Sequence, residues 1–452
     1  MNKGWIALFC GYFALQMLVR LSVGPALELD EAEALFHART LAVGYSAQPP
    51  LYFWLQWGLF QVFGPGLLAL ALLKAILLSG IVTAVFALLK QAVSPNLAGI
   101  STLSLSLLPQ ISWEAQRALT HSVLVLLTSV LVILTFWAVL TKGRWRDYLL
   151  FGVILGLGCL SKYNFGILPL GLLMAALISG YRLKPLRLCA ALAVAGAMVT
   201  PVLFWIAAHP DVASGSVYKL GLGTMGPVMA RLTGAGAFIA ALLAFWALPI
   251  VVLGWLAWRR DRTQPLTLPP LVRFIGLGAV CALVLLALGV LVAGGTAVKD
   301  RWLLPLAWPA VPVAVILLWP ALSNRQQKQL TGLIGALWLV AAAGLPYASL
   351  RDPGYRAADF PALLAEVNRI APGTTTIIDT PIWIAGNLAL IAPDLTLSLS
   401  VNPLPATPSV IITDIPAAVL ENPDIAARAR APVPYTITRG RHVMQVSIIA
   451  LR

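Results

Sequence analysis

The chain alternates between long apolar runs and short polar connections, and this pattern predicts a polytopic membrane protein. A helix needs roughly 20 apolar residues to cross a hydrocarbon core of about 30 Å. The stretch 148–180 is too long for one span and is interrupted by polar residues at 161–164, which predicts two short helices that meet at one membrane face. With these two the pattern predicts about eleven transmembrane helices. The other runs lie near 5–23, 66–88, 95–113, 121–140, 188–207, 236–257, 270–293, 303–320 and 329–349.

The segment 350–452 has a different pattern. Residues 359–369 alternate like an amphipathic helix, and residues 374–379 and 410–413 resemble short strands. These signals predict a small extracytoplasmic α/β domain after an all-α polytopic membrane domain. The expected domains are the transmembrane region 1–349, its first outer loop 24–65, and a cap at 350–452.

Composition and charge agree with a bilayer location. Hydrophobic residues make up 60% of the chain, charged residues 11%, and mean hydropathy is +0.88, which is too apolar for a soluble globular protein. The net charge of +14 lies entirely in residues 1–349, which hold 23 basic and 9 acidic side chains, whereas 350–452 holds eight of each. These basic residues flank apolar runs, so they indicate membrane orientation and no nucleic-acid partner is expected. The four cysteines lie within or beside apolar runs and predict neither disulfides nor a metal site.

The distribution of basic residues also predicts sidedness. We expect the run 5–23 to remain as an uncleaved first span, because it is long enough to cross and no small-x-small cleavage site follows it. Counted at alternating helix ends, fourteen basic side chains fall on the N-terminal side of the membrane and seven on the other side. The positive-inside rule then predicts a cytoplasmic N-terminus and an outer C-terminal tail.

Acidic side chains gather in the first outer loop, where four of them fall within the six residues 28–33. Like charges this close raise one another's pKa unless a cation, metal or substrate offsets them. For Glu28 and Glu33 the favoured interpretation is a solvated turn at the start of a helix. For Asp30 and Glu31 the favoured interpretation is a functional site, and a divalent metal bridging Asp30 is left open.

Cations are expected on the same outer face. Lys162 lies where the two short helices meet, Lys299 and Arg301 lie near the start of a later span, and Lys74 lies inside the second span. A lysine near a helix end usually extends to the interface, but a cation within the membrane normally requires an anionic partner. Carboxylates and cations on one face suit a lipid-phosphate leaving group and an acceptor hydroxyl, because cations hold the phosphate and a carboxylate removes the proton.

Several short motifs then resemble one family of enzymes. Leu-Asp-Glu-Ala-Glu at 29–33, Leu-Ala-Val-Gly-Tyr at 41–45 and Gln-Pro-Pro-Leu at 48–51 resemble the first-loop signature of glycosyltransferase families 39 and 83, which have the GT-C fold. These families include protein O-mannosyltransferases, the aminoarabinose transferase of lipid A and bacterial galacturonosyltransferases of lipopolysaccharide. The segments 144–163 and 299–303 are similar to later family segments. The resemblance covers roughly the first two hundred residues and one later loop.

The resemblance implies roles for particular residues. Asp30 would be the catalytic carboxylate with Glu31 beside it. Lys162 would contact the phosphate of a polyprenyl-phosphate sugar and Arg301 would assist, and we add Lys299 and Lys74 as further phosphate-binding candidates. The expected substrate-lining residues are Tyr45, Gln48, His121 and Tyr163.

The chain departs from the family pattern at three positions. Ala34 stands where an aromatic residue is frequent, and Gln48 stands where His or Lys is common before the paired prolines. Near His121 many members carry a second acid that this chain lacks. No metal ligand is therefore assigned beyond Asp30, no cofactor is assigned, and a divalent metal is left open.

The leading hypothesis is glycosyl transfer on the periplasmic face of the bacterial inner membrane. A polyprenyl-phosphate-linked sugar would be the donor, and a lipid or glycan hydroxyl, including lipid A or lipopolysaccharide, would be the acceptor. No nucleotide is expected. The alternatives are a transporter or flippase of lipid-linked saccharides, which predicts internal symmetry and polar residues near the bilayer midplane, and a structural subunit of an envelope assembly. The sugar, the acceptor and the anomeric outcome are open.

Overall fold

The computed structural model describes residues 3–223, 225–401, 404–405 and 408–452, and its contacts form two compact units. Each unit combines segments that are distant in sequence. The helical unit contains the described residues of Met1–Phe13, Ala42–Tyr52 and Lys74–Ala342, and the cap unit those of Ala14–Leu41, Phe53–Leu73 and Ala343–Arg452. The part of the first outer loop that holds Asp30 therefore groups with the C-terminal segment, while the expected domain boundary at residue 349 stays a prediction.

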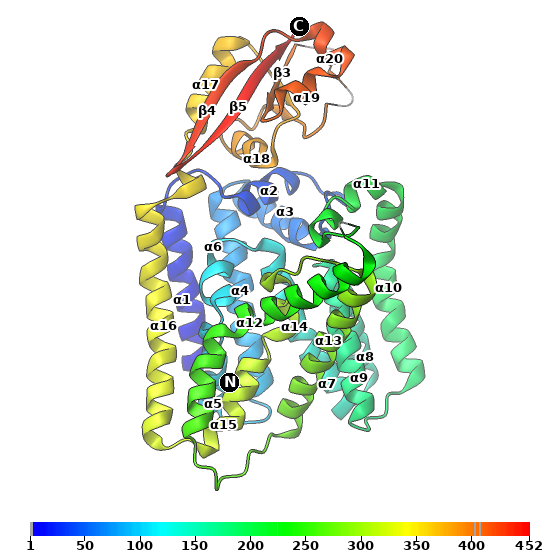
Figure 1. Ribbon diagram of the computed structural model, residues 1–452, viewed down its shortest axis with the longest axis vertical. Coiled ribbons are helices and arrows are strands. Elements are labelled where there is room, and N and C mark those ends of the chain that lie inside the picture. The colour runs from blue at the N-terminus through cyan, green and yellow to red at the C-terminus, as the bar shows by residue number, and fades with distance from the viewer. Residues whose placement is uncertain (1–2, 224, 402–403, 406–407) are drawn as a thin grey trace. The chain divides into compact units, whose positions relative to one another are not determined.

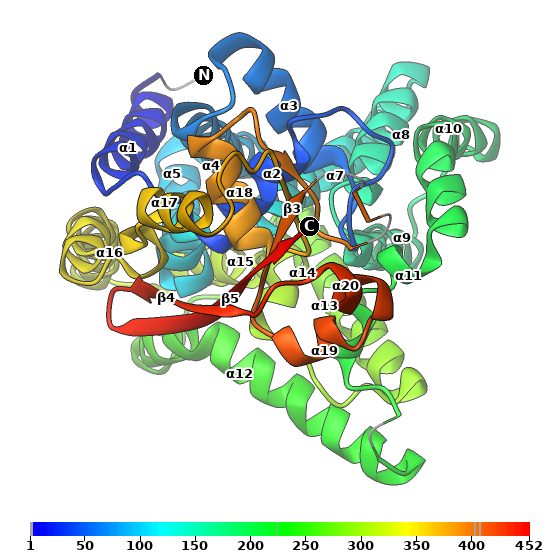
Figure 2. The ribbon, with the colours of Figure 1, turned by 90° about the horizontal axis from the view of Figure 1, so that it is seen from above.

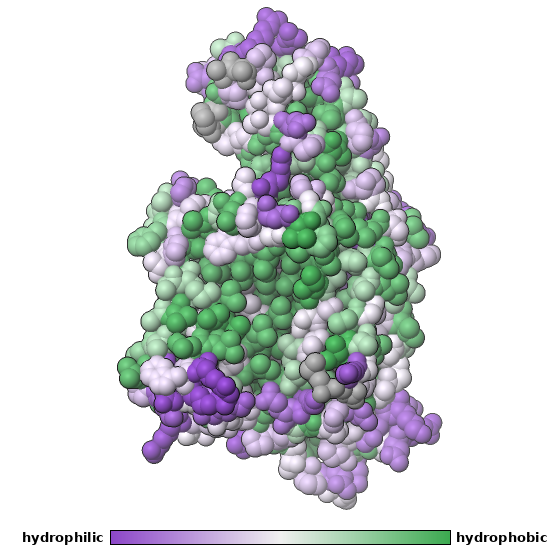
Figure 3. All heavy atoms as spheres, turned by 180° about the vertical axis from the view of Figure 1, so that it is seen from behind, coloured by the Kyte–Doolittle hydropathy of each residue, from purple (hydrophilic) through white to green (hydrophobic). Residues whose placement is uncertain are grey.

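Eight helical segments among the described residues are long and apolar enough to cross a membrane. On the face drawn in Figure 3, hydrophobic side chains form a wide band over the helices and hydrophilic side chains gather along its lower edge. The chain is thus a multi-pass membrane protein. The segments are α1 (Lys3–Ser22), α4 (Leu67–Leu89), α7 (Thr120–Thr141), α10 (Pro185–Ala208), α12 (Pro227–Arg259), α13 (Pro270–Ala293), the run Leu304–Ala321 formed by α14 (Leu304–Ala307), α15 (Ala310–Leu318) and η6 (Trp319–Ala321), and α16 (Asn324–Arg351).

The other three expected spans coincide with shorter helical segments. The chain between α8 and α9 holds Lys162 in an extended conformation (φ −165°, ψ 141°), which confirms two short helices joined at a polar turn. The segments are α5 (Pro95–Leu103) with η1 (Ser104–Leu107) and η2 (Gln110–Glu114), α8 (Trp145–Cys159), and α9 (Ile167–Ile178) after η3 (Tyr163–Gly166). The remaining short elements of the helical unit are α6 (Ala115–Arg117), α11 (Pro210–Ala213), η4 (Val217–Leu220) and η5 (Asp300–Trp302).

Glycines allow close helix packing in the helical unit. Helix α8 lies between α7 and α10, and α9 lies along α13 (Figure 1). A Cβ added at Gly171 of α9 would lie 2.6 Å from the Ala282 nitrogen of α13, and one added at Gly152 of α8 would meet the Ala191 backbone of α10. Small residues at such crossings let membrane helices gain dispersion energy over their whole length.

The cap unit contains a five-stranded sheet in the order β2-β1-β3-β5-β4. Strand β1 is parallel to β2 and β3, whereas β5 is antiparallel to β3 and β4. The strands are β1 (Thr376–Ile378), β2 (Thr396–Leu397), β3 (Ser409–Thr413), β4 (Val433–Arg439) and β5 (His442–Leu451). The helices are α2 (Leu29–His37), most of α3 (Leu51–Phe63), η7 (Gly354–Ala357), α17 (Phe360–Ile370), α18 (Ile382–Ile391), α19 (Pro416–Leu420) and α20 (Pro423–Arg428).

Helices cover both sides of this sheet. Figure 2 shows α17 and α18 on one side of the β4–β5 ribbon and α19 and α20 on the other. Val419 of α19 and Ile425 of α20 belong to a buried cluster with strand residues Ile378, Ile411 and Ile449. The helix expected at 359–369 and the strands expected at 374–379 and 410–413 are confirmed, while the β4–β5 ribbon was not predicted.

Helix α2 is held by the C-terminal part of the cap unit. Asn387 of α18 accepts a hydrogen bond from the Leu27 nitrogen at 2.7 Å, and the Trp383 indole donates to the Leu27 carbonyl, also at 2.7 Å. Gly386 brings the α18 backbone against the Ala32 carbonyl with no room for a Cβ. The acidic first loop and the C-terminal segment therefore share one packed core.

Candidate active site

In the cap unit, Glu31 is the centre of a buried ion-pair network. Arg20 donates from Nε and Nη2 to the two Glu31 carboxylate oxygens at 2.8 and 2.7 Å, and the Arg356 Nη2 lies 3.7 Å from Oε1. The exposed fraction of the side chain is 7% for Glu31, 10% for Arg20 and 5% for Arg356. The bidentate geometry and low exposure identify Glu31 as a structural anchor for α2.

The same network closes the turn that precedes α2. Arg20 also donates to the carbonyls of Gly24 and Ala26, and Glu31 accepts from the Glu28 nitrogen at 3.0 Å. The second carboxylate of the turn, on Glu28, lies 3.9 Å from Arg356. Arginines thus offset two of the four crowded acids, and the start of α2 is fixed in position.

Asp30 lies in the first turn of α2, next to this anchor. Successive side chains on a helix diverge by about 100°, so Asp30 points away from the direction in which Glu31 meets Arg20. Asp30 is half-buried. A catalytic role for Asp30 or Glu31 stays a prediction, and the paired state of Glu31 makes Asp30 the stronger candidate.

The C-terminal end of α2 carries no charge at neutral pH. Burial lowers the pKa of His37 to about 4, and the His37 ring packs 5.1 Å from the Phe53 ring. Burial likewise raises the pKa of Tyr45, whose hydroxyl accepts a hydrogen bond from the Ala42 nitrogen at 2.8 Å. Both groups therefore remain neutral, and Tyr45 fixes the loop of the helical unit in which it lies.

The helical unit contains an irregular segment at residues 108–122 that organises its polar side chains. The turn Gln110–Glu114 is a π-helix in which the Ala115 nitrogen donates to the Gln110 carbonyl. Helix α6 then ends, and Leu119 adopts a left-handed conformation (φ 67°, ψ 51°) before α7 begins at Thr120. π-Turns and left-handed non-glycine residues both cost energy and concentrate at functional sites.

Lys74 stabilises this break. The buried Lys74 ammonium lies 3.3 Å from the carbonyl oxygens of Arg117 and Ala118, where the helix leaves its hydrogen bonds unmade. Lys74 therefore acts on the backbone of the irregular segment, and the phosphate contact expected for it stays a prediction.

Lys162 meets the same segment on its α7 side. The Lys162 ammonium donates to the Ser122 hydroxyl at 2.7 Å. His121, the preceding residue, is buried with its ring 5.3 Å from the ring of Tyr52. Two of the predicted phosphate-binding lysines therefore contact the segment 117–122, which includes the predicted substrate-lining residue His121.

Lys299 and Arg301 line a separate cavity of about 620 Å³ in the helical unit. Asp300 between them is held by the Gln110 amide at 2.7 Å and by the Arg301 nitrogen at 2.8 Å. Glu114 lines the same cavity, opposite small side chains of α12. Because Gln110 and Glu114 form the π-turn, this cavity and the Lys74–Lys162 cluster share one backbone segment.

The remaining predicted residues have less informative surroundings. The Gln48 nitrogen bonds the Ser46 hydroxyl at 3.3 Å, and Tyr163 is 50% exposed. Among the described residues no three His, Cys, Asp or Glu side chains gather in a way that would hold a metal ion.

Arg20, Arg356, Gln110 and Glu114 had no predicted role from the sequence. Two of them could have been found in the sequence: Arg20 is a cation at the edge of the first span, and Glu114 is an acid that the predicted topology puts on the outer face. The cap unit therefore holds the predicted carboxylates, and the helical unit holds all the predicted cations.

Comparisons with known proteins identify the family. The model of the dolichyl-phosphate-mannose-protein mannosyltransferase family matches residues 47–205. The lipopolysaccharide core galacturonosyltransferases RgtB and RgtA of Rhizobium johnstonii are 31% and 33% identical to this chain over 96% of its length, and the matches cover 88% and 86% of those proteins. The chain belongs to the GT-C glycosyltransferases.

Solved structures agree with this GT-C assignment. ArnT from Cupriavidus metallidurans, in the apo state and bound to undecaprenyl phosphate, matches with TM-scores of 0.64 and 0.65 at 12% and 13% identity. Each match covers 99% of this chain and 98% of ArnT. The expected fold, a helical membrane domain with a small C-terminal α/β domain, is confirmed. The relatives are glycosyltransferases, so the enzyme hypothesis is also confirmed over the transporter and structural-subunit alternatives.

Proposed function

We propose that this GT-C enzyme transfers a galacturonosyl group from a polyprenyl-phosphate-linked donor to the core of lipopolysaccharide. The observation that carries this proposal is the similarity to RgtA and RgtB, which extends over 96% of the chain. An undecaprenyl phosphate bound to the structurally similar ArnT supports the donor class. Cationic side chains of the helical unit suit both a phosphate and an acidic sugar.

The proposed chemistry is a displacement at the anomeric carbon. Asp30 accepts the proton of the acceptor hydroxyl, the hydroxyl oxygen forms the new glycosidic bond, and the bond from the anomeric carbon to the phosphate oxygen breaks. Lys162 and Arg301 stabilise the negative charge of the departing prenyl phosphate. Glu31 holds α2 in place through Arg20 and Arg356.

The proposed orientation places this reaction in the periplasm. The basic side chains of the helical unit are more numerous on the N-terminal side of the membrane, which favours a cytoplasmic N-terminus and a periplasmic cap unit in the bacterial inner membrane. Lipid-linked donors are available on the periplasmic side, where nucleotide sugars are absent.

The direct test is Asp30→Asn in membrane vesicles supplied with lipid-linked galacturonate and lipopolysaccharide core acceptor. General-base catalysis contributes about 10²- to 10⁴-fold, so we expect at least a hundredfold loss of transfer with unchanged protein level. Glu33→Gln on the same helix is the matched control and should retain turnover. Wild-type turnover by Asp30→Asn would remove Asp30 from the mechanism.

The sugar is tested separately from the catalytic residue. Wild-type vesicles receive either lipid-linked galacturonate or a lipid-linked neutral hexose of the same prenyl length. We expect transfer of the uronate at least tenfold faster, because a cationic site that pairs a carboxylate rejects an analogue without one. Faster transfer of the neutral hexose would contradict the proposed sugar and leave the glycosyltransferase assignment intact.

A further inference from the structure

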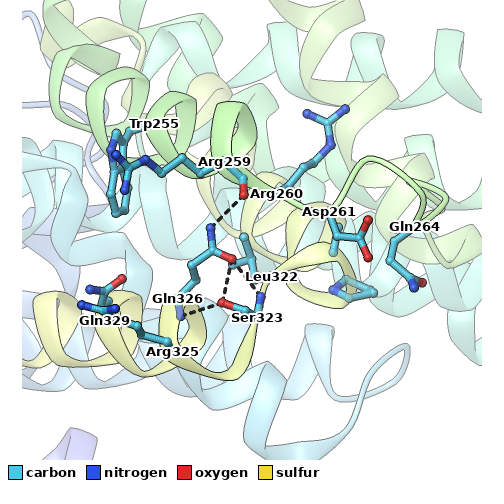
Figure 4. Close-up of a pocket in the computed structure, with 12 residues that line it drawn as sticks. Trp255, Arg259, Arg260, Asp261, Gln264, Leu322, Ser323, Arg325, Gln326 and Gln329 are labelled. Carbon is cyan, nitrogen blue, oxygen red and sulfur yellow. Dashed lines mark hydrogen bonds between the residues drawn. The ribbon is translucent and has the colours of Figure 1, made fainter.

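The helical unit contains a second polar cavity, of about 690 Å³, between the end of α12 and the start of α16. We call it the basic pocket, and Figure 4 shows its lining. Two contacts join its walls: the Asp261 nitrogen donates to the Ala321 carbonyl at 2.9 Å, and the Gln326 amide donates to the Arg259 carbonyl at 3.1 Å. The pocket is therefore built by packed backbone segments and does not arise from loose surface side chains.

The charges of the pocket favour an anion. Arg259, Arg260 and Arg325 line it, and among the described residues none of the three forms an ion pair with a carboxylate. The Arg260 Nε is buried and has no hydrogen-bond partner. The amino-terminal turn of the 28-residue helix α16 adds the positive end of its dipole.

The acid in the lining does not neutralise these arginines. Asp261 accepts hydrogen bonds from the nitrogen and hydroxyl of Thr263 at 2.9 and 2.7 Å, and these bonds lower the pKa of its carboxyl. The Asp261 carboxylate thus closes its own turn. The lining retains three positive charges against one negative charge.

Aromatic residues place the pocket at the level of lipid headgroups. The Arg259 guanidinium lies 5.1 Å from the ring centre of Trp255 and 5.9 Å from that of Trp258. These tryptophans are 41% and 68% exposed on a helix whose length and apolar composition suit a membrane span. Exposed tryptophan at the end of such a helix is typical of the membrane–water interface.

We propose that the basic pocket binds the phosphate headgroup of an anionic phospholipid, such as phosphatidylglycerol. Arg259, Arg325 and the start of α16 would hold the phosphate, Arg260 would add its charge while it donates to the Ala257 carbonyl at 2.6 Å, and the exposed tryptophans would contact the glycerol and upper acyl chains. Phosphate recognition alone would also fit free phosphate, but the interfacial tryptophans favour a lipid. The pocket shares no residue with the proposed catalytic groups, so this binding is independent of the proposed function.

The test measures lipid binding to the full chain in zwitterionic nanodiscs. Phosphatidylglycerol is titrated in, and bound lipid is counted by native mass spectrometry while the thermal midpoint is recorded. The pocket variant is Arg259→Gln with Arg325→Gln, both at exposed positions that tolerate substitution. The matched control is Lys142→Gln with Arg146→Gln, which removes two exposed positive charges of the same unit outside the pocket.

We expect at least a fivefold weaker apparent affinity for phosphatidylglycerol in the pocket variant, loss of its lipid-dependent rise in thermal midpoint, and no change in the control. Equal loss in the control would overturn the proposal in favour of general charge attraction, and equal binding of phosphatidylcholine and phosphatidylglycerol would overturn it because the pocket would then show no preference for an anionic lipid. Displacement of the lipid by millimolar inorganic phosphate would overturn it in favour of a free-phosphate site.

Discussion

Helix α2 in the cap unit and the irregular segment at 108–122 in the helical unit use charge in opposite ways. In the cap unit, Glu31 is bound through both oxygens to Arg20, with Arg356 behind it. In the helical unit, Lys162 donates to a serine hydroxyl and Lys74 lies against two backbone carbonyls. The carboxylate bound by two arginines fixes the start of α2, whereas Lys162 and Lys74 contact the helix break before α7. Glu31 is therefore an anchor of the cap unit, and Lys162 is the group that the proposed function assigns to the donor phosphate.

Removing the anchor should have the largest effect on stability. Glu31→Ala leaves Arg20 and Arg356 buried without their common acceptor, and breaking a buried pair costs about 3–5 kcal/mol. We expect a large fall in the thermal midpoint of the purified protein, together with loss of activity through displacement of α2. Arg20→Gln combined with Glu31→Gln should recover part of the lost stability, because Arg20 then leaves no buried charge behind and Arg356 still has the Glu28 carboxylate at 3.9 Å.

The control for this anchor is Glu366→Gln, which removes another acid of the cap unit that pairs with an arginine. Its partner Arg369 is exposed, and exposed pairs contribute little. We expect an unchanged thermal midpoint. An equal fall in thermal midpoint for Glu31→Ala and Glu366→Gln would show that Glu31 contributes no more to stability than an acid of an exposed ion pair.

The next largest effect should come from Lys162 in the helical unit, which the proposed function assigns to the donor phosphate. Lys162→Met removes a charge-assisted contact worth about 1.5–3 kcal/mol, which corresponds to roughly a ten- to hundredfold fall in kcat/KM. We expect a higher KM for the lipid-linked donor and weaker inhibition by prenyl phosphate, with an unchanged thermal midpoint. Lys162→Arg should restore part of the activity.

A lysine that lies over an aromatic ring provides the matched control. Lys219 lies in the same unit with its ammonium 5.7 Å from the ring centre of Tyr218. Lys219→Met should leave the donor KM unchanged. A loss of stability in Lys162→Met as large as that in Glu31→Ala would erase the distinction between the two regions.

The sequence predicted the fold more completely than the site because apolar run length directly reflects membrane thickness. The spans and the two short helices around Lys162 followed from the lengths of apolar runs, and the cap elements α17, β1 and β3 followed from periodicity. The β4–β5 ribbon was not predicted: β4 exposes Pro434, Thr436 and Thr438, and only the last four residues of β5 form a continuously buried apolar run.

Two features of the site depend on contacts that no local pattern encodes. The run 95–113 was predicted as one span and its pattern gave no sign of a π-turn, and the left-handed Leu119 that follows depends on tertiary contacts such as that of Lys74 with the preceding carbonyls. Glu31 and Asp30 are adjacent acids in the sequence. The bidentate contact of Arg20 with Glu31 and the approach of Arg356, more than three hundred residues away, distinguish the anchor from the catalytic candidate.

A smaller effect is expected where α2 meets α18. A methyl group at Gly386 would collide with the Ala32 carbonyl, so Gly386→Ala forces α2 to shift. Overpacking costs about 1–3 kcal/mol, and we expect a lower thermal midpoint and reduced turnover with little change in donor KM. Gly332→Ala in α16 has open space around the new methyl group and should be neutral or slightly stabilising. Unchanged turnover in Gly386→Ala would show that catalysis tolerates movement of α2.

The smallest effect concerns an acid of the cap unit that faces another acid. Burial and the nearby Asp414 raise the pKa of Asp379, so its ionisation costs stability as pH rises above the ordinary value of 3.8. Asp379→Asn should therefore unfold at a higher temperature than wild type at neutral pH, and this difference should vanish below pH 3.8, where the carboxyl is protonated in both states. Asn suits the left-handed conformation at this position (φ 48°), so the backbone adds no strain. Asp414→Asn should give part of the same gain by removing the repelling charge. A loss of stability at neutral pH in both variants would mean that these two acids are held by attraction, as Glu31 is, and would extend the anchoring role to every buried acid of the cap unit.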